Sequence, residues 1–166
     1  DFDEKEEEGM VPGWTLNLFR EGSSKVELST SIVHKGKQSL KITDGSDRPK
    51  EYTSVQSDLF EVKPGKKYRT RGQVYLGNPP MNNHPGKPYR VSDAAIKVRF
   101  HDKEGKELKV KGNMEKTIKN PQEKWQSFDI SLNAPADAKY MSIILSAGEQ
   151  KLAVVHFDDV HVLENK

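Results

Sequence analysis

Apolar and polar residues alternate with a period of two through most of this chain. The alternation is clearest at 95–100, where Ile96, Val98 and Phe100 share one side and charged residues separate them. Successive side chains of a strand point to opposite faces, so this pattern predicts strands that are half buried against a core. No window carries the apolar stripe of an amphipathic helix. Strands are predicted at 26–29, 39–42, 52–57, 68–76, 95–100, 127–132, 140–146 and 152–163.

Turn-forming residues separate these predicted strands. Lys63-Pro64-Gly65-Lys66 and the segment 102–106, which contains Gly105, are compact turns of the kind that join antiparallel strands. Many short strands joined by turns, without helices, are typical of a β-sandwich of two antiparallel sheets. The sequence shows no linker and no internal repeat, so we expect a single domain over residues 1–166.

Composition excludes several classes of protein. Charged residues make up 31% of the chain, but the net charge is only +2, which argues against nucleic acid as a partner. The chain has no cysteine, and therefore neither disulfides nor cysteine-ligated metal. No apolar run approaches the roughly 18 residues that span a membrane, so we expect no membrane partner. The chain begins without a signal peptide, as a processed protein or an excised module does, and we expect it to be a monomer.

A series of short motifs along the chain resembles the jelly-roll carbohydrate-binding modules grouped around families 4, 9, 16 and 22, in the galactose-binding-like superfamily. No single motif is specific, but their order matches over nearly the whole chain. The motifs are Asp1-Phe2-Asp3, Pro12-Gly13-Trp14-Thr15, His34–Ile42, Val62–Tyr68, Trp125–Phe128, Ala134–Ala138 and Phe157–Val160.

This resemblance implies an all-β jelly roll that binds a polysaccharide or oligosaccharide and catalyses nothing. Modules of this kind are appendages of glycoside hydrolases or polysaccharide lyases, so the other domains of a parent protein become partners. They direct a secreted enzyme to its glycan, which implies an extracellular or bacterial cell-surface location. Two alternatives remain open at this point: a non-glycan adhesion or spacer domain, and a small β-sandwich polysaccharide lyase.

The resemblance also implies a structural calcium ion. Its ligands fall on Asp1, Asp3, the backbone carbonyl of Lys37, and Asp158. Carboxylate and carbonyl oxygens are the ligands that calcium prefers. Asp3 stands where the family has the longer Glu, which shortens the reach of this ligand.

Side-chain parity predicts a binding face. Glycan binding combines flat aromatic rings with planar polar groups that take paired hydroxyls. In related modules the equivalent strands form one concave sheet, and its outward residues here are Tyr52, Gln56, Arg71, Gln73, Tyr75, Lys97 and Arg99. Neighbouring cations on such a face repel one another, which favours an acidic glycan. The alternative is a solvated sheet whose cations pair with carboxylates.

The long connector 77–93 is a second candidate, in which Tyr89 and Arg90, with Asn82, Asn83 and His84, form a lip beside the face; the alternative is a mobile surface loop. Trp14 and Trp125 occupy positions that are core in the family. His156 and His161 are five residues apart on one predicted strand, so parity places them on opposite faces.

Overall fold

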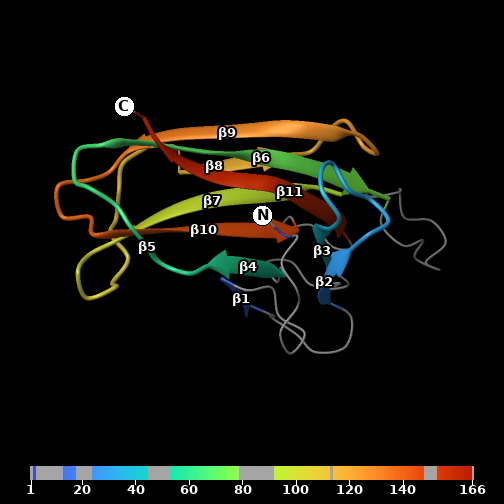
Figure 1. Cartoon of the computed structure of the whole chain (residues 1–166), viewed down its shortest axis with the longest axis horizontal. Helices are drawn as coiled ribbons and strands as arrows, with labels where there is room; N and C mark the ends of the chain where they lie inside the picture. The colour runs from blue at the N-terminus through green and yellow to red at the C-terminus, as the bar shows by residue number, and fades with distance from the viewer. Residues whose placement is uncertain are drawn as a thin grey trace, which may run out of the picture.

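The computed structural model is a sandwich of two β-sheets, and it describes residues 2, 13–17, 24–44, 53–78, 92–112, 114–147 and 153–165 (Figure 1). Eleven strands are present in these residues. They are β1 (Trp14–Asn17), β2 (Lys25–Ser29), β3 (Ser39–Asp44), β4 (Ser54–Ser57), β5 (Phe60–Glu61), β6 (Lys67–Gly77), β7 (Ala94–His101), β8 (Glu115–Ile118), β9 (Trp125–Asn133), β10 (Tyr140–Ala147) and β11 (Ala153–Glu164). No helix in this described part is long and apolar enough to cross a membrane.

Each sheet is named here after its central strand. The β10 sheet has the order β1-β4-β10-β7-β8, and β5 also pairs with β10. The β11 sheet has the order β2-β3-β11-β6-β9. All strand pairs are antiparallel. Figure 1 shows the two layers, with β9, β6 and β11 in one and β10, β7 and β4 in the other. The predicted all-β sandwich is confirmed.

The predicted strands match the observed ones closely, because the period-two pattern reports which residues face the core. The strand predicted at 95–100 extends by one residue at each end, and those predicted at 68–76 and 140–146 also agree within one residue. Three observed strands were not predicted: β1, β5 and β8. Each is short, and too few residues alternate in them to give a signal.

A single cluster of buried apolar side chains fills the space between the two sheets. Phe100 and Leu145 reach it from the β10 sheet, and Phe157 and Leu76 reach it from the β11 sheet. Phe2 is fully buried in this cluster, with its ring centroid 5.6 Å from that of Trp14. Trp14 packs against the core, as predicted.

Strands that follow one another in the sequence often belong to different sheets. β6 pairs with β9 and β11, whereas β7 pairs with β10 and β8. The chain therefore crosses from one layer to the other between Gly77 and Ala94. This crossing decides which side chains can share a face.

A β-bulge interrupts β11 beside β6. Asp158 pairs with Gln73 and His161 pairs with Arg71, so three steps along β11 match two along β6. Asp159 adopts a φ of 50°, a conformation that Asp tolerates better than most residues. The extra residue reverses side-chain parity along the rest of β11.

Candidate functional site

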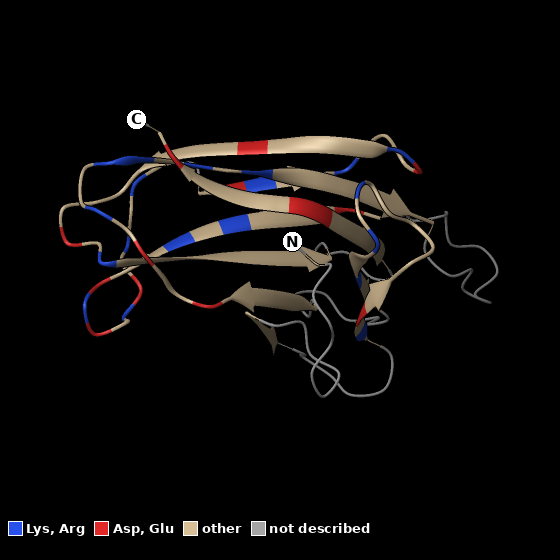
Figure 2. Ribbon diagram, in the orientation of Figure 1, with Lys and Arg blue, Asp and Glu red and all other residues tan. Residues whose placement is uncertain are grey.

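The predicted binding residues lie on two opposite surfaces of the sandwich rather than on one. Gln56, Lys97 and Arg99 point outward from the β10 sheet, on a surface called here the β10 face. Arg71 and Gln73, together with Tyr75, point outward from the β11 sheet, on the β11 face. The prediction of one shared face was wrong, because β6 and β7 belong to different sheets. Figure 2 shows the two basic bands of β7 in one layer and the acidic bands of β9 and β11 in the other.

A row of three small side chains crosses the β10 face, where Ser146 pairs with Ser54 on one side and with Ala95 on the other. They point away from the core, since their strand neighbours belong to the buried cluster. They are nevertheless at most 5% exposed. In the next outward row Ile144 lies between Gln56 and Lys97, so an apolar side chain separates this row of small residues from Ser142.

A hydrogen-bond chain runs across three strands of the β10 face. The amide Nε2 of Gln56 donates to Ser142 Oγ at 3.2 Å, and Ser142 Oγ lies 2.9 Å from His101 Nε2. His101 Nδ1 lies 3.2 Å from the carbonyl oxygen of Gly105, which can only accept. A neutral imidazole bonded in this way carries its proton on Nδ1 and accepts at Nε2 from the Ser142 hydroxyl. This chain fixes the Gln56 amide with its carbonyl oxygen still able to accept.

The cations of the β10 face are paired with carboxylates. Arg99 Nε lies 3.0 Å from Glu107 Oε1, and Lys97 Nζ lies 3.6 Å from Glu115 Oε2. The Lys97 side chain is only 10% exposed. The predicted repulsion between Arg71, Lys97 and Arg99 was therefore wrong: Lys97 and Arg99 have acidic partners, and Arg71 lies on the other sheet.

Tyr140 is an aromatic residue of the β10 face that sequence reasoning missed. It pairs across the ladder with His101, and directly opposed residues point to the same side of a sheet. Its side chain is half-buried, and the Lys139 ammonium lies 6.0 Å from the centre of its ring. Counting from the buried Met141 along the predicted strand would have placed it outward.

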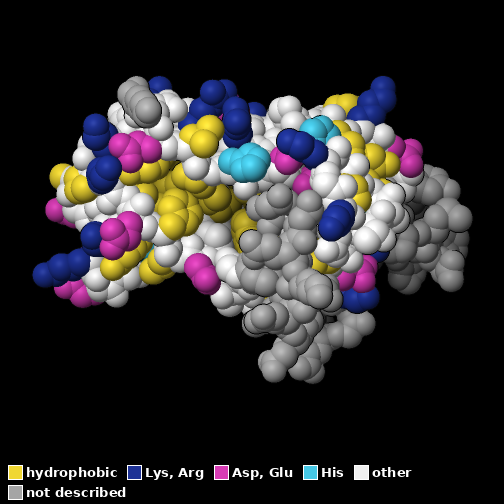
Figure 3. All heavy atoms as spheres, viewed as in Figure 1, with side chains coloured by type: hydrophobic (Ala, Val, Ile, Leu, Met, Phe, Trp, Pro, Cys, Tyr) yellow, Lys and Arg dark blue, Asp and Glu magenta, His cyan; other side chains and the backbone are white. Residues whose placement is uncertain are grey.

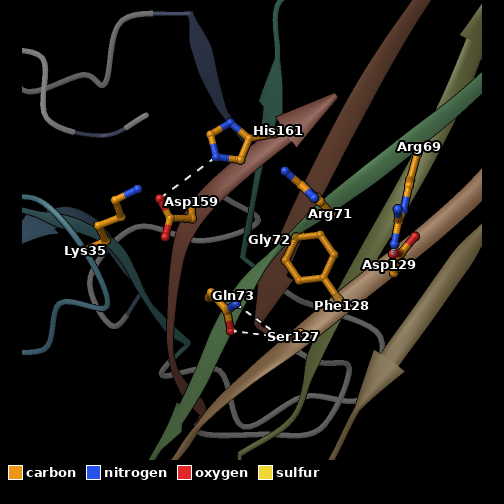
Figure 4. A pocket seen from close by; sticks show the side chains of 10 residues that line it. All are labelled: Lys35, Arg69, Arg71, Gly72, Gln73, Ser127, Phe128, Asp129, Asp159 and His161. Atoms are coloured by element: carbon orange, nitrogen blue, oxygen red, sulfur yellow. Dashed lines mark hydrogen bonds and ion pairs between the residues drawn. The ribbon is translucent and has the colours of Figure 1, made fainter. Parts of the chain in front are cut away.

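A hollow opens on the β11 face where the bulge of β11 meets β6 (Figure 4). It has a volume of about 400 Å³. Gly72 lies at its floor, opposite the bulge, because its neighbours Arg71 and Gln73 pair with His161 and Asp158. This bulge hollow is lined by Lys35, Arg69, Arg71, Gly72, Gln73, Ser127, Phe128, Asp129, Asp159 and His161.

Polar contacts fix one wall of the bulge hollow. Arg69 Nε donates to Asp129 Oδ2 at 2.7 Å, and this bond lowers the pKa of Asp129. The Gln73 amide bonds to Ser127 Oγ at 3.1 Å. Figure 3 shows dark blue, cyan and magenta side chains close together over β11, so charges of both signs mix on this surface.

An aromatic group adjoins the bulge hollow. The Trp125 ring centroid lies 5.6 Å from that of Tyr75 and 5.4 Å from that of His34. Trp125 was predicted to be core, but it is half-buried on the outer side of β9, directly opposite Tyr75. The prediction failed because the register of β9 places Phe128, rather than Trp125, against the core.

Asp158 holds the loop before β3 against β11. Its carboxylate is 1% exposed and accepts from the backbone N–H groups of His34 at 2.9 Å, Lys35 at 3.1 Å and Asp159 at 2.7 Å. Asp158 thus lies beside the loop that carries Lys37, and the predicted calcium site at these residues stays a prediction. The Asp158 charge is already balanced by three donors. The described residues contain no cluster of three or more metal-ligating side chains.

His156 and His161 lie on the same face, contrary to the parity argument, because the bulge adds one residue between them. His161 is exposed near Asp159, with Nε2 3.9 Å from Oδ1. His156 is buried, and its Nδ1 lies 3.1 Å from Ser39 Oγ. Burial, assisted by the nearby Lys41 ammonium and opposed by Glu27, lowers the pKa of His156 from 6.5 to about 4.

Several predicted residues lie outside the described part of the chain. They are Asp1 and Asp3 of the calcium site, Tyr52, Tyr89 and Arg90 of the binding face, and Asn82, Asn83 and His84 of the predicted lip. Their roles stay predictions.

Comparison with known proteins defines the fold class. No family model matches the chain, and no curated protein matches it in sequence. Among solved structures, the xylan-binding domain CBM22-1 of Paenibacillus barcinonensis Xyn10C superposes with a TM-score of 0.62 at 19% identity, over 99% of this chain and 91% of that one. A family 16 carbohydrate-binding module gives 0.59 at 14% identity, over 92% of each chain. The fold is therefore the jelly roll of carbohydrate-binding modules.

The same fold occurs within a larger protein of different character. The enzymatically active domain of bacteriophage CBA120 tailspike protein 4 superposes with a TM-score of 0.67 at 11% identity, over 95% of this chain. This chain spans about a fifth of that tailspike chain, since the match covers 20% of it. At these identities the likeness establishes the fold, and the site has to be argued from its own residues.

Proposed function

We propose that this chain is a non-catalytic carbohydrate-binding module whose main glycan site is the β10 face. Its jelly-roll fold is shared with xylan-binding and other carbohydrate-binding modules. In this proposal the module belongs to a secreted parent enzyme and directs it to a polysaccharide. In this proposal the β10 face of this domain binds the glycan, whatever other domains the parent protein contains.

The observation that carries the proposal is the hydrogen-bond chain from Gln56 through Ser142 to His101, beside the Tyr140 ring. Polar groups that are fixed before binding lose little conformational entropy when a sugar hydroxyl replaces water. Arg99, held by Glu107, adds a planar donor on the next strand. Tyr140 supplies the flat apolar surface against which a sugar ring stacks.

The carboxylates of the β10 face support a binding role rather than a catalytic one. A glycosidase needs two carboxyl groups that are free to exchange protons or attack the sugar. Here Glu107 is committed to Arg99, and Glu115 is committed to Lys97. The same pairing leaves no excess positive charge at Lys97 or Arg99, so this face suits a neutral glycan chain.

Affinity electrophoresis in gels that contain xylan, mixed-linkage glucan or polygalacturonate tests the proposal directly. We expect a neutral polysaccharide to retard the protein, and Tyr140→Ala to weaken that binding by about tenfold or more, since a stacked ring contributes on the order of 1.4 kcal/mol. Tyr140→Phe is the matched control, because it keeps the ring and loses only the hydroxyl; its affinity should stay within about threefold of the parent protein.

Two results would contradict the proposed site. If no polysaccharide retards the folded protein, the module is an adhesion or spacer domain. If Tyr140→Ala binds as tightly as the parent protein while Trp125→Ala does not, the main glycan site lies on the β11 face. Products with new ultraviolet absorbance on polygalacturonate would instead identify a lyase.

A further inference from the structure

The bulge hollow on the β11 face has the size of a small-molecule site. Its volume of about 400 Å³ lies within the range of roughly 300–1,000 Å³ that is usual for ligand pockets. The hollow lies over the backbone of Gly72, where the extra residue at Asp159 interrupts the regular pairing of β11 with β6. The Phe128 ring occupies the space that a side chain at Gly72 would take, so the hollow is bounded by the outward residues of the two strands and by Lys35 from the loop before β3.

Two cations of the hollow have no partner of their own. The Arg71 guanidinium is exposed, makes no hydrogen bond or ion pair with any described residue, and reaches Asp129 only by longer-range attraction. The Lys35 ammonium likewise makes no ion pair within the described residues, although its backbone N–H bonds to Asp158. Figure 4 shows the two side chains entering from opposite sides, with Asp159 and His161 between them.

The other charges of the hollow are already occupied. Asp129 is bonded to Arg69. Asp159 Oδ2 lies 2.9 Å from His34 Nδ1, and its Oδ1 faces His161. The lining has three cations (Lys35, Arg69 and Arg71) and two carboxylates (Asp129 and Asp159), so it carries one net positive charge when the histidines are neutral. Arg71 and Lys35 are the two lining cations that make no ion pair within the described residues.

We propose that the bulge hollow is a second binding site, which takes the anionic oxygen group of an acidic sugar, either a uronate carboxylate or a sugar sulfate. The planar Arg71 guanidinium presents paired N–H donors to such a group, and the exposed Lys35 ammonium provides a second positive charge from the loop before β3. The Gln73–Ser127 pair offers polar atoms to the sugar hydroxyls. The exposed part of Trp125 lies beyond, as a surface for a neighbouring sugar ring.

This inference rests on the proposed function only in expecting a sugar as ligand, and it concerns the opposite surface of the sandwich. A chain that binds glycan on both faces would bridge two polysaccharide strands.

An NMR titration of the ¹⁵N-labelled chain separates the two sites. The probes are a glucuronate-bearing xylo-oligosaccharide, the same compound as its methyl ester, and a sulfated disaccharide. We expect the glucuronate compound to shift the backbone amides of Gly72, Ser127 and Asp159 in addition to those of the β10 face. The methyl ester should shift the β10 face alone, because it lacks only the charge.

Charge-removing variants test the residues. Arg71→Gln and Lys35→Gln should each weaken binding of the acidic probe at the hollow by about tenfold, as expected when one charge-assisted contact is lost. Lys66→Gln is the matched control, because it removes an exposed lysine in the turn before β6. All three side chains are exposed, so thermal melts should show unchanged stability.

The outcomes for the two sites are distinguishable. If the acidic probe leaves Gly72 and Ser127 unshifted, or if the methyl ester binds the hollow equally well, the second site is refuted while neutral-glycan binding on the β10 face stands. The same conclusion follows if inorganic sulfate alone competes as strongly as the sulfated disaccharide, since the hollow would then recognise an anion and no sugar. A probe that binds the hollow when no neutral glycan binds the β10 face would support this site and refute the main one.

Discussion

The two outer faces of the sandwich use similar residues in different ways. On the β10 face, Lys97 and Arg99 are paired across neighbouring strands with Glu115 and Glu107. On the β11 face, Arg69 is paired with Asp129, but Arg71, two residues along the same side of the same strand, is not. Within the described residues, the first face therefore presents fixed polar groups with Lys97 and Arg99 paired, and the second presents available cations around a hollow.

The difference shows that the neighbours of a cation on the adjacent strand, more than its position on its own strand, decide whether it is ion-paired. Arg69 and Arg71 share a face of β6, and their partners on β9 are Ser131 and Asp129 respectively. Arg69 reaches diagonally to Asp129, so the acid directly opposite Arg71 is already occupied. Diagonal neighbours in antiparallel sheets lie within reach of such long side chains.

The largest loss of stability is expected for a substitution at Asp158, and it should affect the β11 face and leave the β10 face intact. Asp158→Ala removes the acceptor for three backbone N–H groups beneath the loop that carries His34 and Lys35. Buried donors left without partners each cost about 1–3 kcal/mol, so we expect urea unfolding to show a loss of about 4 kcal/mol. The β11 face should lose its acidic-probe binding, while the β10 face keeps its glycan.

Asp159→Asn serves as the control, because Asn also tolerates the positive φ and should cost less than about 1 kcal/mol.

The predicted calcium ion is tested in the same series. If calcium binds Asp158, a chelator lowers the melting temperature of the parent protein and has no effect on Asp158→Ala. An equal melting temperature of the parent protein with and without chelator would contradict the predicted structural calcium ion.

The next effect concerns pH and is confined to the β11 face. The folded chain protonates His156 at a pKa of about 4, whereas the unfolded chain takes that proton near 6.5. The unfolded state therefore binds more protons between these values, and stability is full above pH 6.5 and falls as the pH drops toward 4. At about 1.4 kcal/mol for each pKa unit, the loss reaches about 3 kcal/mol.

Urea unfolding at a series of pH values in chelator-containing buffer measures this loss. His156→Gln should flatten the part of the profile between pH 6.5 and 4, and His161→Gln, at an exposed position beyond the bulge, should leave it in place. Identical slopes in all three proteins would show that His156 is not the group responsible.

The smallest effect is expected at Gly72. A methyl group there would lie 2.6 Å from Phe128 Cζ and 3.2 Å from the carbonyl oxygen of Asp158. Phe128 is 1% exposed and has little room to move, so Gly72→Ala should cost about 2 kcal/mol by overpacking. The substitution should destabilise the β11 sheet without altering glycan affinity on the β10 face.

A double-mutant cycle checks this explanation. In a Phe128→Leu background the ring is absent, and Gly72→Ala should then cost clearly less than it does alone. An additive cycle would mean that the strand conformation at Gly72, rather than contact with the ring, sets the cost.

Much of the fold was predictable because strand formation depends on the local alternation of apolar and polar residues. Alternation at 95–100 identified both the strand and its buried side, and the strand predicted at 140–146 agrees within one residue with the observed one. The candidate site was predicted less well. Gln56 and Arg99 do point outward together, but Arg71, Gln73 and Tyr75 were grouped with them on the assumption that consecutive strands share a sheet.

The errors on β11 and β9 have the same origin. A single extra residue at the bulge places His161 on the same face as His156, and the local sequence pattern of 153–164 does not predict this bulge. Trp125 was predicted to be core from its position in the resembled family, yet the register with β6 places it opposite Tyr75. Both outcomes depend on hydrogen bonds to a strand about 50 or more residues away in the sequence.

The sequence by itself determined that this chain is an all-β sandwich and which side of most strands is buried, because the alternation of side chains is a property of the strand alone. Only the tertiary structure decided which strands lie together, which cations are paired, and that a hollow opens at Gly72. The physical reason is that strand pairing and ion pairing join residues far apart in the chain. Two surfaces that appear as one basic face in the sequence are therefore separated by the whole thickness of the core.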